Sequence, residues 1–218
     1  MNIAIILSGG VGRRFGADLP KQYSNLCGQP MINYVLETVF NAKKIDEVVL
    51  VIDDEYLSLI NIPNTKNVHI VPNGQERVYS VKNALDHIKN NIPEAKNIII
   101  TQAVQPFITT EQVDTYIEKL NDYDVVVTAE KCVGEIFNKN KFEKLDRNLY
   151  YFCQSPESFK FDDLYNNLDL NSEFSELIYH YPNEPKIYYY LDMQNNIKIT
   201  QKSDLEYAEF IMKNKLGK

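Results

Sequence analysis

A glycine-rich segment with basic side chains begins at residue 8, directly after an apolar run. Residues 8–16 read Ser-Gly-Gly-Val-Gly-Arg-Arg-Phe-Gly, and Leu-Pro-Lys-Gln follows at 19–22. Glycine lets main-chain amides approach phosphate oxygens closely, and arginine and lysine neutralise the charge that remains. The segment therefore predicts a phosphate-binding loop, with Arg14 and Lys21 as candidate cations.

This loop matches neither common phosphate-binding template. A P-loop needs lysine next to its last glycine, and the dinucleotide fingerprint needs glycine where Phe15 stands. The alternative interpretation is an ordinary turn between a strand and a helix with arginines on its surface. Several glycines, two arginines and a Pro-Lys pair in one loop favour phosphate binding over that alternative.

The elements that must position this loop alternate between strand and helix. Continuous apolar runs, as strands buried on both faces require, occur at 3–7, 48–52, 68–71, 98–101 and 125–128. Helical patterns lie between them at 31–42, 78–89 and 110–120. This order predicts an α/β fold, a Rossmann-like, mostly parallel sheet with helices on both faces.

In such sheets ligands bind beyond the carboxyl ends of the strands. The loops after Leu7, Val71, Thr101 and Thr128 are therefore expected to converge on one crevice.

The second half of the chain is less regular. Residues 132–154 form an excursion of Asn, Lys, Asp and aromatic residues without a clear core face. After it we expect a strand at 197–200 and a helix that begins at Ser203, whose side chain would cap it.

Composition limits the classes of protein to which the chain can belong. It has 218 residues and a net charge of −7, with 44% hydrophobic and 24% charged residues, which is typical of a single folded domain over 1–218. An acidic chain lacks the positive field of a nucleic-acid binder. Its apolar runs are much shorter than the roughly 20 residues that cross a bilayer. We therefore expect no nucleic acid and no membrane among its partners.

Cysteine and histidine spacing gives no metal signature. Cys27, Cys132 and Cys153 form no CxxC pair, and the three histidines lack ligand spacing, so we expect no zinc site. The first seven residues lack the basic flank of a signal peptide. A cytoplasmic location is expected.

Four segments resemble, in the same order, the cytidylyltransferases that act on methylerythritol phosphate and on ribitol phosphate. They are the opening loop at 7–22, Asn-Gly-Gln-Glu-Arg-Val-Tyr-Ser-Val at 73–81, Gln-Pro-Phe-Ile-Thr at 105–109 and Asn-Ile-Lys-Ile-Thr at 196–200. The resemblance covers nearly the whole chain. It implies a fold of the nucleotide-diphospho-sugar transferase type with a protruding dimerisation arm.

The resemblance also implies a reaction. The phosphate oxygen of an alcohol phosphate attacks the α-phosphorus of CTP, which releases pyrophosphate and leaves a CDP-alcohol without a covalent enzyme intermediate. Such a transfer depends mainly on positioning and charge neutralisation. Arg14 and Lys21 match the positions that steady the triphosphate, and Lys198 matches the lysine placed on the α-phosphate or the incoming phosphate.

Other positions match the part of the family that binds the nucleotide, with the main chain at 7–10 as a slot for cytosine. An ion pair with Asp86 is the structural alternative for Arg77. The implied nucleotide-binding residues are Leu7, Ser8, Gly9, Gly10, Gly12, Gly74, Arg77, Ser80 and Gln102.

Asp146-Arg147-Asn148 resembles the Asp-Arg-Asn element of the family's arm, which inserts into the neighbouring subunit. The excursion at about 132–154 would then be that arm, and the protein a homodimer. Arg147 would reach the acceptor phosphate, and Glu135 matches a position that binds the acceptor. The alternative is a solvated loop.

Four positions depart from the family pattern by carrying an amide in place of a charge. Gln102 replaces the aspartate that helps to hold Mg²⁺, and the other three are Gln75, Gln105 and Asn195. Because Mg²⁺ prefers carboxylates, we expect it to bind weakly. Asp192, or else Glu135, is a candidate replacement carboxylate.

Two hypotheses follow. One is an active cytidylyltransferase for a polyol phosphate, with a ribitol 5-phosphate-like acceptor preferred over methylerythritol phosphate. The other is a nucleotide-binding scaffold without catalysis. The retained Arg14, Lys21 and Lys198 favour activity.

Overall fold

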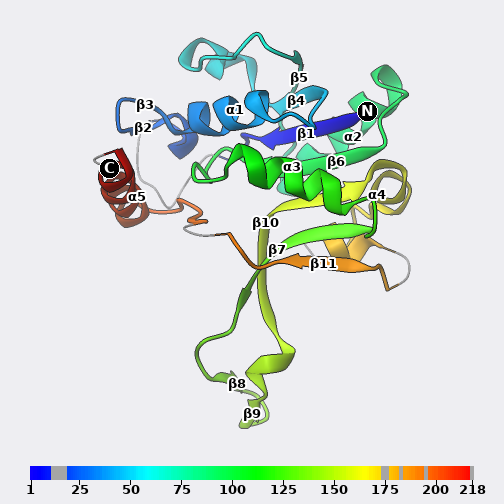
Figure 1. The fold of residues 1–218 in the computed structure, drawn as a ribbon, viewed down its shortest axis with the longest axis vertical. Helices are drawn as coiled ribbons and strands as arrows, with labels where there is room; N and C mark the ends of the chain where they lie inside the picture. The colour runs from blue at the N-terminus through cyan, green and yellow to red at the C-terminus, as the bar shows by residue number, and fades with distance from the viewer. Residues whose placement is uncertain (11–18, 173–176, 182–183, 194–195, 217–218) are drawn as a thin grey trace.

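A seven-stranded sheet forms the centre of the protein (Figure 1). The computed structural model describes residues 1–10, 19–172, 177–181, 184–193 and 196–216. In spatial order the strands are β11 (Ile187–Tyr190), β7 (Val125–Lys131), β10 (Tyr151–Lys160), β6 (Asn97–Gln102), β1 (Asn2–Leu7), β4 (Glu47–Val51) and β5 (Asn67–Val71). β10 is antiparallel to both of its neighbours, and the other pairs are parallel. The expected mostly parallel sheet is confirmed.

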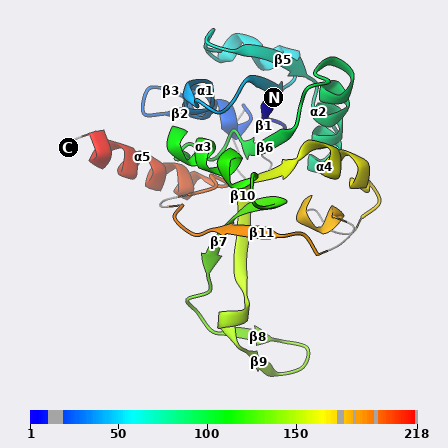
Figure 2. The same cartoon turned by 45° about the vertical axis from the view of Figure 1, so that its right-hand side comes forward.

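Helices cover both faces of the sheet (Figure 2). Side chains alternate along β1, so that Ala4 and Ile6 pack with α1 (Met31–Asn41) and α3 (Thr110–Lys119). Ile3 and Ile5 pack on the other face with α2 (Arg77–Asn91) and α4 (Phe161–Asn167). Burial on both faces explains why the strand sequences are continuously apolar.

Residues 132–150 project from the sheet between β7 and β10 (Figure 1). Their tip is a hairpin of β8 (Ile136–Asn138) and β9 (Glu143–Leu145), followed by one turn, η3 (Arg147–Leu149). The rings of Phe137 and Phe142 lie 5.4 Å apart between centroids, and both side chains are exposed.

The C-terminal part of the chain differs from the sequence-based expectation. The expected strand at 197–200 is wrong, because these residues belong to no strand, and β11 at 187–190 lies beside β7 instead. Residues 196–200 lie beside the loop that follows β6, where the main-chain amide of Ile199 donates to the carbonyl of Val104 (3.0 Å). β10, which contains Pro156 and several polar residues, was not expected as a full strand.

The expected cap of the last helix is also wrong. α5 (Lys202–Leu216) includes Ser203, and the carboxylate of Asp204 accepts hydrogen bonds from the main-chain amides of Thr200 (2.7 Å) and Gln201 (2.9 Å). The acidic side chain in the first turn therefore binds back to the main-chain amides just before the helix, as the acidic residue of a capping box does. Two short hairpin strands, β2 (Asn25–Leu26) and β3 (Gln29–Pro30), precede α1, and β2 contacts α5.

No helix within the described ranges is long and apolar enough to cross a membrane.

Candidate functional site

A cavity of about 350 Å³ opens at the carboxyl ends of β1 and β6. The register pairs Leu7 with Gln102, so these two strand ends lie side by side. The loop before α2 and the segment at 198–200 close the other sides. The lining residues are Leu7, Ser8, Gly9, Gly10, Lys21, Gln22, Gly74, Gln75, Glu76, Arg77, Ser80, Gln102, Ala103, Val104, Lys198 and Thr200.

The structure thus brings together most of the residues that the sequence predicts for nucleotide binding. Three of the four loops expected to converge do so, those after Leu7, Val71 and Thr101. The loop after Thr128 does not line this cavity, since β7 continues to Lys131 and leads into the projecting segment. Gly12 and Arg14 lie outside the described residues.

Two glycines in the cavity wall lie close to other residues, Gly9 to a side chain and Gly74 to main-chain atoms, so that glycine is required by close approach at Gly74. A Cβ atom on Gly9 would lie 2.3 Å from Oδ1 of Asn73, and one on Gly74 would lie 2.7 Å from the main-chain nitrogen of Ser80. Gly74 also donates its amide to Oγ of Ser80 (3.0 Å), which ties the loop to the first turn of α2. The glycine loop and the start of α2 therefore form one main-chain surface.

The Leu-Pro-Lys-Gln segment folds back onto the glycine loop. It forms a short turn, η1 (Lys21–Tyr23), in which Nε2 of Gln22 donates to the carbonyl of Ser8 (2.6 Å). The hydroxyl groups of Tyr23 and Ser8 are 3.0 Å apart, and burial raises the pKa of Tyr23. The side chains of Gln22 and Tyr23 are buried, and their bonds to Ser8 fix the adjacent Lys21 relative to the glycine loop. Sequence analysis missed these two positioning roles.

Arg77 lies at the edge of the cavity and pairs with a buried carboxylate. Its Nη2 donates to Oε2 of Glu157 on β10 (2.8 Å), and the side chain of Glu157 is 6% exposed. The alternative pairing with Asp86 is wrong, because Lys82 takes that carboxylate. Glu157 was not expected from the sequence, since β10 itself was not.

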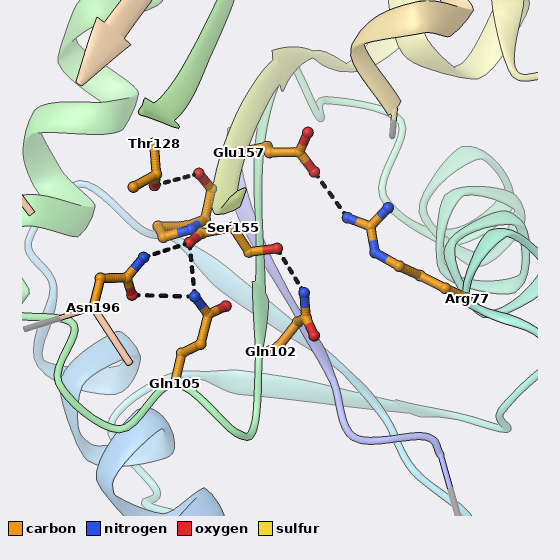
Figure 3. Close-up of polar contacts among 8 residues, drawn as sticks. Arg77, Gln102, Gln105, Thr128, Ser155, Glu157 and Asn196 are labelled. Carbon is orange, nitrogen blue, oxygen red and sulfur yellow. Dashed lines mark hydrogen bonds and ion pairs between the residues drawn. The ribbon is translucent and has the colours of Figure 1, made fainter. Parts of the chain in front are cut away.

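Two of the four amides that replace charged residues, Gln102 and Gln105, converge on Ser155 of β10 (Figure 3). Nε2 of Gln102 donates to Oγ of Ser155 (2.7 Å), while Nε2 of Gln105 donates to its carbonyl oxygen (2.8 Å). Asn196 donates to the same carbonyl (2.9 Å) and accepts from Gln105 (3.1 Å). Gln75 lines the cavity, and Asn195 lies outside the described residues.

A second cavity of about 1090 Å³ adjoins the first and shares Arg77, Gln102 and Lys198 with it. Its walls come from β10, β11 and the residues around η4 (Leu177–His180). Most of the lining side chains offer hydroxyl, amide or carboxylate groups: Tyr151, Tyr179, Tyr181, Tyr189, Gln154, Ser155, Glu157 and Glu184. Lys198 lies at the boundary, where groups bound in the two cavities would meet.

Glu135 and Arg147 lie on the projecting segment and line neither cavity of their own chain. Lys144 pairs with Glu135 (2.8 Å) and holds the pKa of its carboxyl below the usual value. Nη1 of Arg147 donates to the carbonyl of Val133 (2.7 Å). A role at the acceptor is possible for Arg147 only in a second subunit.

The donor set fits a Mg²⁺ ion held chiefly by substrate phosphates. Within the described ranges, no three His, Cys, Asp or Glu side chains are placed to hold a metal. Asp192 is exposed and lines neither cavity. Gln102 and Glu76 do line the first cavity, and one or two protein oxygens plus phosphate oxygens are a common Mg²⁺ environment.

Known proteins are similar to this chain over almost its whole length. The family model of 2-C-methyl-D-erythritol 4-phosphate cytidylyltransferase matches residues 2–214. The enzyme of that name from Thermosipho melanesiensis is 31% identical over 218 residues, which cover 94% of this chain and 95% of the relative. A bifunctional ribulose 5-phosphate reductase/CDP-ribitol pyrophosphorylase from Haemophilus influenzae is 29% identical and aligns with 95% of this chain, although over only 47% of its own length.

Solved structures share the fold. The 4-diphosphocytidyl-2C-methyl-D-erythritol synthase from Anaerococcus prevotii superposes with a TM-score of 0.78 at 24% identity, over 97% of this chain and 98% of that one. The 2-C-methyl-D-erythritol 4-phosphate cytidylyltransferase from Francisella tularensis gives a TM-score of 0.76 at 22% identity, over 96% and 98% of the chains.

Proposed function

Because the chain belongs to the 2-C-methyl-D-erythritol 4-phosphate cytidylyltransferase family and is a CTP-dependent cytidylyltransferase, we propose that its acceptor is a polyol phosphate, with a ribitol 5-phosphate-like acceptor preferred over methylerythritol phosphate. The reaction releases pyrophosphate and forms a CDP-alcohol. The observation on which the proposal rests is the pair of adjoining cavities that meet at Lys198.

CTP occupies the smaller cavity in this proposal. Main-chain groups at 7–10 and the Gly74–Ser80 contact form a narrow slot for cytosine. Lys21 and Arg14 neutralise the β- and γ-phosphates, which become the leaving pyrophosphate. Mg²⁺, when bound, would neutralise part of the same negative charge, with Gln102 and Glu76 as the protein ligands within reach of the phosphates.

The acceptor occupies the larger cavity. Its phosphate oxygen must approach the α-phosphorus in line with the departing pyrophosphate, so it has to lie at the shared boundary. Lys198 and Arg77 line both cavities and can neutralise the charge that accumulates there. A preorganised cation of this kind typically contributes about 100- to 1000-fold to kcat.

The preference for a ribitol-like chain is supported by the chemistry of the larger cavity. Tyrosine hydroxyls, Gln154, Ser155 and Glu157 can bind the hydroxyl groups of a polyol chain, and a ribitol phosphate offers one more of these than methylerythritol phosphate and has no methyl branch. The glycine pair, Leu-Pro-Lys-Gln and Pro-Phe-Ile-Thr also look closer to the ribitol phosphate enzymes.

We further propose a cytoplasmic homodimer. The projecting segment exposes large apolar side chains, with Phe142 87% and Leu149 77% exposed, which would be buried against a second copy. Insertion into the partner would bring Arg147 of one subunit to the acceptor site of the other. The three cysteines are free, as is usual in a reducing cytoplasm.

Purified protein, CTP and Mg²⁺ or Mn²⁺ should be tested with a panel of alcohol phosphates that includes ribitol 5-phosphate and methylerythritol phosphate. We expect pyrophosphate release with a polyol phosphate, and the largest kcat/KM with the ribitol compound. A larger kcat/KM with methylerythritol phosphate would refute the preference. CTP binding without turnover for any acceptor would instead favour the non-catalytic scaffold.

A variant pair controls this assay. Lys21→Ala should lower turnover about 100-fold or more, because it removes a cation from the triphosphate site. Lys213→Ala removes a lysine of α5 that lines neither cavity and pairs with Glu209 (2.9 Å). It should leave turnover unchanged.

A further inference from the structure

We infer that Gln105 and Asn196 are positioning residues that fix Lys198 at the boundary of the two cavities, through one shared acceptor, the main-chain carbonyl of Ser155 (Figure 3). The inference rests on the proposed function, because the position of Lys198 matters only if phosphates meet there.

The segment that contains Lys198 has no sheet pairing to hold it. Residues 196–200 belong to no strand or helix. On the C-terminal side, the carboxylate of Asp204 holds the amide (2.7 Å) and hydroxyl (2.7 Å) of Thr200, and the amide of Ile199 donates to Val104. On the N-terminal side, the side chain of Asn196, two residues before the lysine, donates to the carbonyl of Ser155 (2.9 Å).

An irregularity in β10 leaves the main-chain carbonyl of Ser155 available to side-chain donors. The pairing of β10 with β7 shifts register between Gln154 and Glu157, so Ser155 has no partner in that ladder. Its carbonyl accepts instead from Gln105 and Asn196, and Gln105 also donates to Oδ1 of Asn196. Two donors thus bind one acceptor and each other.

These contacts are deeply buried. Gln105 is 1% exposed, Ser155 5% and Asn196 7%. Hydrogen bonds in such surroundings are electrostatically stronger than in water, and a buried donor without its acceptor is costly, so the arrangement has little freedom to change. Because only one residue separates Asn196 from Lys198, a fixed Asn196 restricts how far the main chain at Lys198 can move.

Ser155 also connects the hydrogen bonds of Gln105 and Asn196 to the two cavities. Its hydroxyl accepts from Gln102, which lines both cavities, while Glu157 two residues later pairs with Arg77. β10 therefore holds three cavity residues in register: Gln102, Arg77 and, through the amides, Lys198.

The test compares Gln105→Met, which keeps the length of the side chain but removes its N–H donors, with Gln105→Arg, which keeps donors. The resemblance of Gln-Pro-Phe-Ile-Thr at 105–109 to the Arg-Pro-Phe-Ile-Thr segment of the cytidylyltransferases implies that arginine can be accommodated at this position. We expect Gln105→Met to lower kcat about 10- to 100-fold with the KM for CTP changed less than about threefold, since misplacement by about 1 Å can cost that much. Gln105→Arg should retain most of the activity.

A double-mutant cycle separates positioning from general damage. If Gln105 acts through Lys198, Gln105→Met should change kcat less than about threefold in the Lys198→Ala background, because the group that it positions is gone. Asn196→Ala, at a site nearer the surface, should behave in the same way and replaces Gln105→Met if that variant does not fold. The inference would be overturned if Gln105→Met lowered kcat by the same factor with and without Lys198. It would also be overturned if Gln105→Arg had a kcat as low as that of Gln105→Met.

A readout without turnover keeps this test separate from the proposed function. Bound CTP should protect Lys198 from acetylation by acetic anhydride in the wild-type protein, as measured by peptide mass spectrometry. In Gln105→Met this protection should fall at CTP saturation. Wild-type protein that fails to turn over any acceptor would refute the proposed function alone, whereas equal protection in both proteins would refute the positioning role.

Discussion

Replacing Gly74 by alanine is expected to weaken CTP binding, although the change adds only one methyl group. The added Cβ would lie 2.4 Å from Cβ of Tyr79, 2.6 Å from its carbonyl carbon and 2.7 Å from the nitrogen of Ser80. Two of these are main-chain atoms in the first turn of α2, which cannot rotate away. The loop at Gly74 must therefore move away from the helix.

The size of the effect follows from that displacement. Overpacking of this kind costs about 1–3 kcal/mol. The loop can relieve the strain in the free protein by moving, but CTP then has to restore the original main-chain surface. If the whole cost is taken from binding, CTP affinity falls about 5- to 150-fold, at 1.4 kcal/mol for each factor of ten. The hydrogen bond from Gly74 to Ser80 (3.0 Å) would be lengthened as well.

Calorimetric titration of CTP into the wild-type and variant proteins measures this loss. Gly134→Ala is the matched control, because a Cβ there meets no atom within 4 Å and Gly134 lines neither cavity. Its affinity for CTP should equal that of the wild type. Unchanged affinity in Gly74→Ala would refute the argument that the α2 loop and helix form the nucleotide slot.

Three further predictions concern the metal, pH and the dimer. Gln102→Asp should lower the Mg²⁺ concentration needed for half-maximal pyrophosphate release, because it adds a carboxylate to the site; an unchanged requirement would show that another group already binds the metal. Burial and the charge of His69 lower the pKa of His87, so its contribution to the free energy of unfolding is complete above pH 6.5 and declines as the pH falls below that value; His87→Gln should flatten this slope in urea titrations, and an unaltered slope would exclude the pair as its source. Phe142→Asp should convert the proposed dimer into monomers in light scattering, whereas an intact dimer would place the interface elsewhere.

The sequence predicts the N-terminal half of the fold well because its strands are buried on both faces. The run at 3–7 and its neighbours have no polar face, and the glycine loop follows directly at the edge where ligands bind. The positions of Gly74 and Gln102 in one cavity follow from that parallel order, whereas Lys21 is held there by the contacts of Gln22 and Tyr23 with Ser8. The roles of these residues stay predictions until variants are measured.

The C-terminal half was less predictable for a physical reason. β10 contains Ser155 and Glu157, polar residues whose partners come from elsewhere in the chain, and Pro156, which has no main-chain N–H to donate. Its local sequence is therefore not typical of a buried strand. Ile197 and Ile199 resemble a strand, yet their segment is held by side chains and one main-chain bond to Val104. Long-range contacts decide both cases, and no local pattern contains them.

The central claim is that the main-chain slot and its cations bind CTP in the smaller cavity. Calorimetric titration of the wild-type protein with CTP and with ATP tests it most directly. The account predicts one CTP site per chain and much weaker binding of ATP, because a purine does not fit the slot. It also predicts CTP binding at least tenfold weaker in Lys21→Ala and unchanged in Lys213→Ala. Equal binding of the two nucleotides, or CTP affinity unaffected by Lys21→Ala, would contradict it.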